Sequence, residues 1–239
     1  MCSTPTAETN AFFKQQWETY RRVFSHNYMR HRELAGMVNA YLRSIVSKPY
    51  SLLDLGCGDA AFARMAAQGT GLASYIGIDL SPAALDFARE AMTAEGLECE
   101  FIETDISSAP RILADRGRHF DVVLASFSVH HLSREAKQRL LADVRQLLRR
   151  NGIFVMVDCV MRSSESRDQY LRRYLNGIRK GWTELDVAEI DAIEEHITSS
   201  DFPESCETLI QIADAVGCRF ERQYVAEDYQ DMLVRFHYD

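Results

Sequence analysis

The sequence predicts an α/β fold in which helices cover both faces of a mostly parallel sheet. Short apolar runs alternate with longer segments whose apolar residues recur at helical spacing, and this β-α-β alternation is typical of parallel sheets. The run 120–126 is apolar almost throughout, as expected of a central strand that is buried on both faces. Two further segments, 219–225 and 232–238, are expected as strands near the end of the sequence. We therefore expect a single domain over residues 1–239.

Composition narrows the class of protein. The chain has 239 residues, of which 46% are hydrophobic and 26% are charged, and this suits one α/β domain with an added cap. The net charge of -8 argues against a nucleic-acid partner. We see no signal peptide and no run of about 20 apolar residues, and the six cysteines lack zinc-site spacing. We expect a cytoplasmic monomer or homodimer without metal or membrane association.

The elements follow in a definite order. Residues 1–47 should form a helical arm, because aromatic residues recur there at spacings near three and four, and Lys48-Pro49 should end it. A core at 48–160 follows, with helices expected at 60–68, 82–95 and 134–150. The segment 161–200 is charged but has an apolar helical face and should form a helical cap. Residues 201–239 should return as one helix and two strands.

The turn after the first core strand is the most informative motif. The apolar run Leu52 to Leu55 leads into Gly56 and Gly58, with one residue between the two glycines. Glycine adopts backbone angles closed to other residues and lets the chain approach a ligand, and the following helix offers unpaired N–H groups. The turn therefore predicts a nucleotide-like cofactor. A nicotinamide cofactor fits too, since Ala61 completes a permissive Gly-x-Gly-x-x-Gly/Ala pattern and an acid lies about 20 residues on.

Polar side chains follow three further strands where each leaves the sheet. The run 75–79 ends in Asp79, and Ser81-Pro82 then opens a helix with a cap and a first-turn proline. The run 100–104 leads into Asp105, and 120–126 ends in Ser126. A carboxylate at such a strand end can accept two hydrogen bonds from a vicinal diol. These positions therefore extend the cofactor site.

From residue 50 onward the chain resembles the class I S-adenosylmethionine-dependent methyltransferases. Their first motif, Asp-x-Gly-x-Gly-x-Gly, is matched from Asp54 to Ala60, with Ala60 in place of the last glycine. The resemblance implies a Rossmann-like, mostly parallel seven-stranded sheet with a closing antiparallel C-terminal hairpin, which nicotinamide domains lack. It also implies that S-adenosyl-L-methionine is the cofactor and that its methyl group passes by in-line displacement to O, N or S of a small metabolite.

The same resemblance assigns residues to the cofactor. Asp79 would hold the ribose hydroxyls, Asp105 would accept from the adenine amine, and Ile106 would cover a ring face. Arg32 of the arm would pair with the methionine carboxylate. The expected cofactor-binding set is Asp54, Gly56, Gly58, Asp79, Leu80, Asp105, Ile106, Ser126 and Arg32.

Catalysis needs little from the protein if positioning dominates, since alignment of reactants can supply about 7–11 kcal/mol. Candidates exist for a group that accepts a proton or orients the acceptor. His131 follows the fourth core strand in His130-His131-Leu132, Asp158 leaves the fifth strand at its carboxyl end, and His196 belongs to the cap. For His130 we expect a structural role.

Two alternatives remain open from the sequence. One is an NAD(P)-dependent Rossmann oxidoreductase, which the expected hairpin disfavours. The other is a non-catalytic S-adenosylmethionine-binding regulatory protein. A nucleobase acceptor is disfavoured because Ser126-Phe127-Ser128-Val129 stands where nucleobase methyltransferases have a sequence like Asn-Pro-Pro-Tyr.

Overall fold

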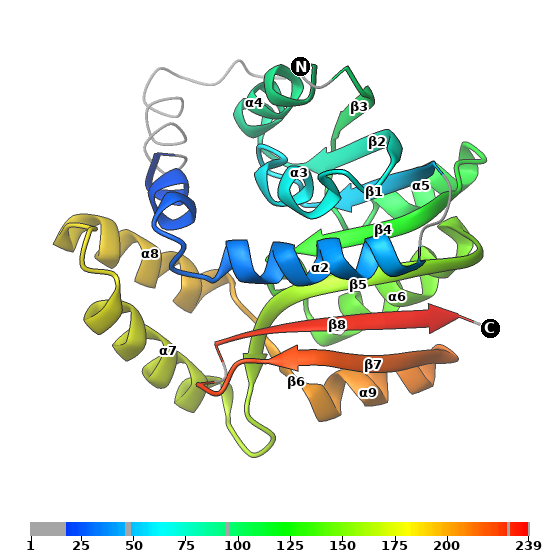
Figure 1. Ribbon diagram of the computed structural model, residues 1–239. Helices are drawn as coiled ribbons and strands as arrows, with labels where there is room; N and C mark the ends of the chain where they lie inside the picture. The colour runs from blue at the N-terminus through cyan, green and yellow to red at the C-terminus, as the bar shows by residue number, and fades with distance from the viewer. Residues whose placement is uncertain (1–17, 46–48, 94–95, 229, 239) are drawn as a thin grey trace, which may run out of the picture.

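The computed structural model describes residues 18–45, 49–93, 96–228 and 230–238. Within these residues, seven strands form a sheet in the order β3-β2-β1-β4-β5-β8-β7, and a two-residue strand, β6, pairs with the end of β5 (Figure 1). The strands are β1 (Tyr50–Leu55), β2 (Leu72–Asp79), β3 (Glu98–Glu103), β4 (Phe120–Ser126), β5 (Leu148–Met161), β6 (Glu204–Ser205), β7 (Cys218–Val225) and β8 (Asp231–Tyr238). The expected Rossmann-like sheet is confirmed, and β6 is an addition that the sequence pattern did not indicate.

Among the described strands, β8 alone runs against the others. β1 pairs in parallel with β2 and β4, and β4 pairs in parallel with β5. β8 is antiparallel to both β5 and β7, so the expected C-terminal hairpin is present. The carboxyl ends of β1, β2, β4 and β5 therefore meet at one edge of the sheet, where open α/β sheets bind ligands.

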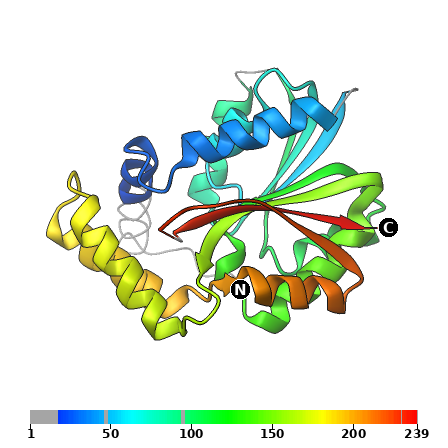
Figure 2. The same ribbon diagram turned by 60° about the horizontal axis from the view of Figure 1, so that its bottom comes forward.

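Helices cover both faces of the sheet (Figures 1 and 2). One face carries α2 (His31–Ile45), α3 (Ala61–Ala67) and α4 (Pro82–Thr93), and the other carries α5 (Ala109–Asp115), α6 (Arg134–Leu147) and α9 (Cys206–Ala215). Successive strand residues point to opposite faces. Leu52 thus packs in one cluster with Leu34 of α2, whereas Leu53 packs in the other cluster with Leu140 of α6.

The cap consists of α7 (Arg167–Gly181) and α8 (Val187–Ser200), which lie beyond the carboxyl edge of the sheet (Figure 1). Each helix begins with a capping box, in which the N-cap side chain and the third helical side chain bond each other's backbone N–H, as Ser166 and Gln169 do in α7. Apolar side chains of both helices, Trp182 between them and Val23 of the helical segment 18–25 form a cluster of their own. The cap and this segment therefore pack as one layer.

The sequence patterns located most helices and missed one among the described residues. The helices expected at 60–68, 82–95 and 134–150 correspond to α3, α4 and α6. Helix α5 was not expected, although Ser108 at its N-cap and Pro110 in its first turn are start signals. The arm before residue 18 and its expected end at Lys48 lie outside the described residues.

No helix among the described residues is long and apolar enough to cross a membrane. The division of 1–239 into arm, core, cap and returning segment stays a prediction.

Candidate active site

The glycine turn between β1 and α3 has the backbone that the motif predicted. Gly56 and Gly58 have φ angles of +76° and +54°. A residue with a side chain is strained in this left-handed region of the backbone. A Cβ atom on Gly56 would lie 2.4 Å from the Cβ atom of Ser128, whose hydroxyl donates to the Leu55 carbonyl at 2.7 Å. Ala60 also has a positive φ, +60°, so the position of the missing third glycine keeps the backbone that glycine would favour.

Asp79 ties the glycine turn to the end of β2. Its Oδ2 atom accepts from the Gly58 N–H and its Oδ1 atom from the Ser81 N–H, each at 2.8 Å. Each carboxylate oxygen retains an accepting lone pair, so Asp79 can still bind a diol. Leu80 beside it is 64% exposed, which leaves an apolar surface next to the carboxylate.

The other expected cofactor residues differ in how far they reach the surface. Asp105 accepts from the Ser107 N–H at 2.7 Å and holds the turn before α5, and Ile106 packs partly buried beside the core. Ser126 ends β4 and is half-buried. Asp54, in contrast, is buried inside β1, where it accepts from the Tyr75 hydroxyl at 2.8 Å. Burial raises the pKa of Asp54 to about 7. Asp54 therefore supports the glycine turn from within the sheet.

The basic residue expected at the cofactor, Arg32, contacts the arm in the structure. Arg32 is exposed, and its guanidinium donates to the Ser25 carbonyl at 2.6 Å, so its side chain is held within the arm. Among the described arm residues, Tyr20 and Arg21 lie nearer to the glycine turn, and the Arg21 guanidinium lies 5.8 Å from the Phe87 ring centroid. Burial of the Tyr20 hydroxyl and then the charges of Asp59 and Asp79 raise the Tyr20 pKa. Arg21 lies near enough to Asp59 to oppose, by its charge, the rise in pKa that burial causes there.

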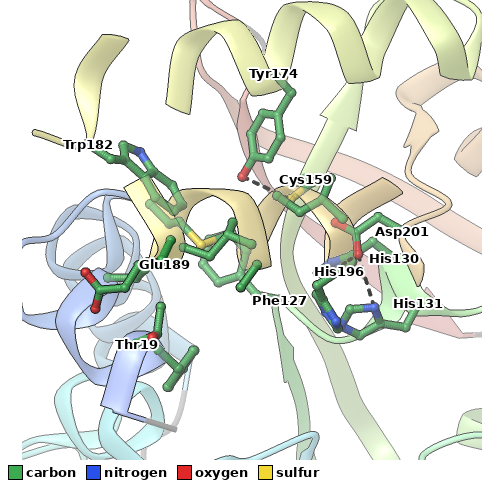
Figure 3. Close-up of a pocket in the computed structure, with 17 residues that line it drawn as sticks. Thr19, Phe127, His130, His131, Cys159, Tyr174, Trp182, Glu189, His196 and Asp201 are labelled. Atoms are coloured by element: carbon green, nitrogen blue, oxygen red, sulfur yellow. Dashed lines mark hydrogen bonds and ion pairs between the residues drawn. The ribbon is translucent and has the colours of Figure 1, made fainter. Parts of the chain in front are cut away.

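A pocket of about 400 Å³ lies between the cap, segment 18–25 and the carboxyl ends of β4 and β5 (Figure 3). Its walls are mainly apolar and aromatic. Three histidines and Asp201 gather at one end, which we call the polar end, whereas Thr19 and Glu189 lie toward the other. The lining residues are Thr19, Tyr20, Val23, Met29, Phe127, His130, His131, Cys159, Tyr174, Trp182, Ala188, Glu189, Ala192, Ile193, His196, Ile197 and Asp201. Tyr20 therefore belongs both to this pocket and to the surroundings of the glycine turn.

Phe127 links the pocket to the sheet. It follows β4 with a φ of +52°, uncommon for a bulky residue, and its N–H donates to the Val157 carbonyl at 2.8 Å. Its ring meets the edge of the buried His31 ring at a centroid distance of 5.1 Å. The place of Phe127 directly after the fourth core strand predicts that it lies at the rim of the site, but its positive φ has no local signal in the sequence.

The polar end of the pocket starts from a buried pair, His130 and Asp158. The His130 Nδ1 atom lies 2.5 Å from Asp158 Oδ1, and the backbone N–H of His130 donates to Asp158 Oδ2 at 3.0 Å. Burial alone would lower the pKa of His130, but the Asp158 carboxylate, aided by Asp201, raises it above the ordinary value. Asp158 also accepts from the Cys159 N–H at 2.8 Å and does not line the large pocket. It therefore positions His130, a role that we had not expected for it.

His131 and His196 face the pocket beside this pair. The His131 Nδ1 atom lies 3.3 Å from the Ser200 carbonyl and 3.3 Å from Asp201 Oδ1. The rings of His131 and His196 meet edge to face at 5.3 Å, and burial, then the charge of His131, lowers the pKa of His196. The structure thus brings both histidines together with Asp201. The sequence missed that aspartate as a site residue, because it lies 70 positions after His131.

Comparison with known proteins agrees with this geometry. Residues 52–152 match the family model described as a methyltransferase domain. An uncharacterized methyltransferase of Bacillus cytotoxicus is 24% identical over 68% of this chain and 72% of its own. Residues 52–152 therefore carry a methyltransferase domain, and the strand order and closing hairpin of the sheet are those of the class I, S-adenosylmethionine-dependent fold. A 2-ketoarginine methyltransferase of Streptomyces arginensis is 29% identical over 51% of this chain and 35% of its own.

The fold of the methyltransferase domain is shared with solved structures. The plantazolicin methyltransferase BpumL, solved in complex with SAH, superposes with a TM-score of 0.62 and 16% identity over 94% of this chain and 93% of its own. Apart from the first, the curated relatives match this chain over about half of their own length or less. The nicotinamide alternative is set aside, because both the family model and the closing hairpin indicate a methyltransferase.

Proposed function

We propose that this methyltransferase transfers the methyl group of S-adenosylmethionine to a small molecule held in the pocket under the cap. One observation supports this most directly: Tyr20 lines that pocket, and it also lies close enough to Asp59 and Asp79 at the glycine turn for their charges to add to the rise in its pKa that burial causes. A cofactor bound at the turn would therefore adjoin the pocket in which the acceptor is bound.

The pocket itself narrows the class of acceptor. A volume of about 400 Å³ lies within the range of small-molecule sites, which are mostly apolar with a few placed polar groups. Here Val23, Trp182 and Ile193 supply apolar walls, whereas the histidines and Asp201 stand at one end. The acceptor would be a largely apolar molecule whose reacting atom faces that polar end. The 2-ketoarginine methyltransferase, by its name, also acts on a small molecule.

The residues divide the work in the following way. The turn at Gly56 and Gly58, Asp79, Leu80, Asp105 and Ile106 would bind the cofactor, with Arg21 in the place that we had expected for Arg32. Ser126 and Asp54 would support that site. The cofactor supplies an electrophilic methyl group on a sulfonium. A lone pair of the acceptor attacks the methyl carbon in line as the sulfur leaves, so the main task of the protein is alignment. His131 and His196 line the pocket and would hold the acceptor group, and Asp158 would hold His130.

The test is turnover with a variant that fills the pocket. Ala192 lies on the pocket side of α8, so Ala192→Trp should abolish methyl transfer to any small-molecule acceptor while the affinity for S-adenosylhomocysteine stays unchanged. Ala215→Trp, at an exposed position of α9, is the matched control. A panel of hydroxylated and amine-bearing aromatic compounds is assayed by production of S-adenosylhomocysteine. Equal turnover in Ala192→Trp and wild type would contradict the proposal.

The same turnover assay and affinity measurement address the remaining alternative, a non-catalytic S-adenosylmethionine-binding regulatory protein. A regulatory protein would bind S-adenosylmethionine but transfer no methyl group to any compound in the panel. For the enzyme we keep the expectation of a cytoplasmic location. We also keep the expectation of a monomer or homodimer, and size-exclusion chromatography with light scattering will measure that oligomeric state.

A further inference from the structure

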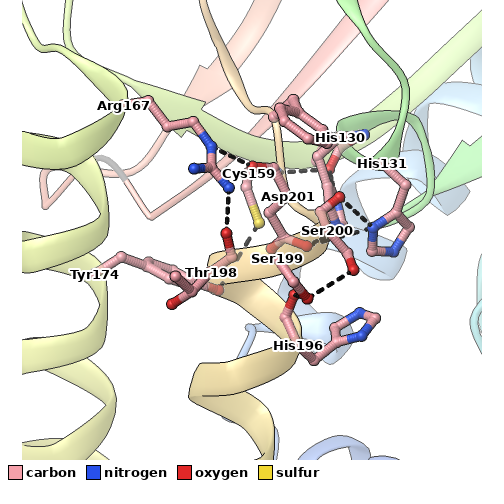
Figure 4. Close-up of polar contacts among 12 residues, drawn as sticks. His130, His131, Cys159, Arg167, Tyr174, His196, Thr198, Ser199, Ser200 and Asp201 are labelled. Atoms are coloured by element: carbon pink, nitrogen blue, oxygen red, sulfur yellow. Dashed lines mark hydrogen bonds and ion pairs between the residues drawn. The ribbon is translucent and has the colours of Figure 1, made fainter.

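Two imidazoles and one carboxylate converge at the polar end of the pocket. Asp201 Oδ1 lies 3.3 Å from His131 Nδ1 and 3.6 Å from His130 Nε2. All three of these atoms lie within 4.8 Å of one another (Figure 4). They come from the 3-10 turn Val129–His131 after β4 and from the residue that follows α8. Core and cap thus each contribute to one cluster.

The cluster leaves one carboxylate oxygen without a hydrogen bond. Asp201 is 3% exposed, and its Oδ1 atom makes no hydrogen bond to any part of the chain that the structure describes. A buried carboxylate oxygen without a donor costs free energy. His131 Nδ1 and His130 Nε2 face it without the alignment of a hydrogen bond. His131 Nδ1 also lies 3.3 Å from the Ser200 carbonyl, a hydrogen bond that it would give up on binding a metal ion. An atom placed between these three groups would satisfy all of them.

We propose that His130, His131 and Asp201 bind a divalent transition-metal ion, and that this ion holds an oxygen atom of the methyl acceptor. Metal-ligand bonds of about 2.0–2.2 Å at tetrahedral angles place ligand atoms about 3.3–3.5 Å apart. The distances of 3.3 Å and 3.6 Å fit that spacing. Two imidazoles and one carboxylate suit zinc, iron, cobalt or nickel, whereas magnesium and calcium prefer oxygen ligands.

The surroundings support the cluster as a metal site. Metal-binding histidines commonly donate their other ring N–H to a carboxylate, which fixes the ring. Here Asp158 Oδ1 lies 2.5 Å from His130 Nδ1, which leaves Nε2 directed toward Asp201. The Asp201 backbone is fixed as well, since its carbonyl accepts from Arg167 Nε at 2.8 Å and the next residue, Phe202, donates to the His130 carbonyl at 2.7 Å. Asp158 and Arg167 are positioning residues in this arrangement.

The pocket leaves room for a further ligand. His130, His131 and Asp201 all line it, so three protein ligands would leave a coordination position that faces the acceptor, as in catalytic metal sites. A metal-bound hydroxyl loses its proton more readily. The acceptor O–H would release its proton to water. Its oxygen would then bond to the methyl carbon, while the carbon-sulfur bond breaks with its electron pair going to sulfur. An ether and S-adenosylhomocysteine result.

This step rests on the proposed methyl transfer, but the metal site can be tested without it. Protein freed of its affinity tag and treated with a chelator is titrated with Zn²⁺ by calorimetry, with neither cofactor nor acceptor present. We expect one ion per chain with a Kd below about 10 µM. Co²⁺ should give visible absorption bands typical of four or five ligands.

Variants assign the ligands. Asp201→Asn keeps the side-chain shape and should weaken Zn²⁺ binding about 10-fold or more, as should His131→Ala. His119→Ala, at an exposed histidine elsewhere, is the control and should change nothing. Retained affinity for S-adenosylhomocysteine will show that each variant is folded.

The outcomes separate the metal site from the proposed function. Absence of Zn²⁺ and Co²⁺ binding by wild type, or binding that survives both ligand variants, overturns the metal site. Methyl transfer by chelator-treated protein that is undiminished and unaffected by added Zn²⁺ overturns the role of the ion and leaves the proposed function intact. One bound ion with no acceptor in any panel overturns the proposed function and leaves the site.

Discussion

At the scale of single residues, two separate requirements restrict position 56 to glycine. Its φ is +76°, and a Cβ atom would also lie 2.4 Å from Ser128. Backbone strain of this kind costs about 1–3 kcal/mol, and overpacking in a core costs about as much again. Gly56→Ala should therefore lower the free energy of unfolding by more than strain alone explains, and it should weaken S-adenosylhomocysteine binding.

Gly71 is the matched control for that prediction. Its φ is +85°, but a Cβ atom there would meet nothing within 4 Å. Gly71→Ala should show the cost of strain alone and leave cofactor affinity unchanged. Urea unfolding and calorimetry on both variants make the comparison. Equal losses of stability in the two variants would mean that Ser128 moves aside.

Residues with strong local signals were predictable, and residues placed by long-range packing were not. Gly56, Gly58 and Asp79 lie at a strand end where residue type and spacing alone indicate the backbone and the cofactor. Arg32 and Arg21 show the limit of prediction from local sequence. Both are basic residues of the arm, and only the packing of segment 18–25 decides which one approaches Asp59.

At the scale of elements, one ionic contact joins segment 18–25 to the cap. Arg22 Nη1 lies 2.7 Å and 2.6 Å from the two carboxylate oxygens of Glu189 in α8, and its Nη2 donates to the Glu184 carbonyl. Because the Arg22 side chain is 44% exposed, this contact should add at most about 1 kcal/mol to global stability. Its expected effect is local. Arg22→Ala should speed amide hydrogen exchange in residues 18–25.

Arg179→Ala provides the control for Arg22. Arg179 pairs with Asp191 and Glu194, so it joins α7 to α8 without touching segment 18–25. Its replacement should leave exchange in that segment unchanged. Hydrogen exchange followed by mass spectrometry, with and without S-adenosylhomocysteine, makes the comparison. Unchanged exchange in Arg22→Ala would show that apolar packing around Val23 alone holds the segment.

The same scale explains why the polar end of the pocket was only partly predictable. His131 and His196 were expected from their neighbours in sequence, but their approach to Asp201 depends on where α8 ends. That end is fixed by Arg167, which donates to the Thr198 and Asp201 carbonyls at 2.6 Å and 2.8 Å. No local pattern reveals such a contact, so the cap was predictable as helices and its join to the core was not.

At the scale of the whole molecule, two buried groups oppose each other in the pH dependence of stability. Burial raises the pKa of Asp54 from 3.8 to about 7, so the folded state binds more protons and stability falls as pH rises through this range. Burial lowers the pKa of His31 from 6.5 to about 4. The folded state then binds fewer protons, and stability rises with pH between those values.

The two single variants should therefore tilt the stability curve in opposite directions. Both ring nitrogens of His31 lack a hydrogen bond among the described residues, and its ring packs between Phe24 and Phe127 at centroid distances of 4.5 Å and 5.1 Å. His31→Phe should gain a few kcal/mol over wild type at pH 4.5, a gain that shrinks toward pH 7. Asp54→Asn keeps the acceptor for Tyr75 and should gain most at pH 7.5 and least at pH 4.5.

Urea unfolding of the three proteins at four pH values between 4.5 and 7.5 measures these differences. Every other titrating group, His130 and Asp158 included, is common to all three proteins, so its contribution cancels in the difference from wild type. Parallel curves for His31→Phe and wild type would show that His31 is protonated or solvated in the folded state. Parallel curves for Asp54→Asn and wild type would show that Asp54 stays ionised under the glycine turn, where its charge would face the sulfonium of a bound cofactor.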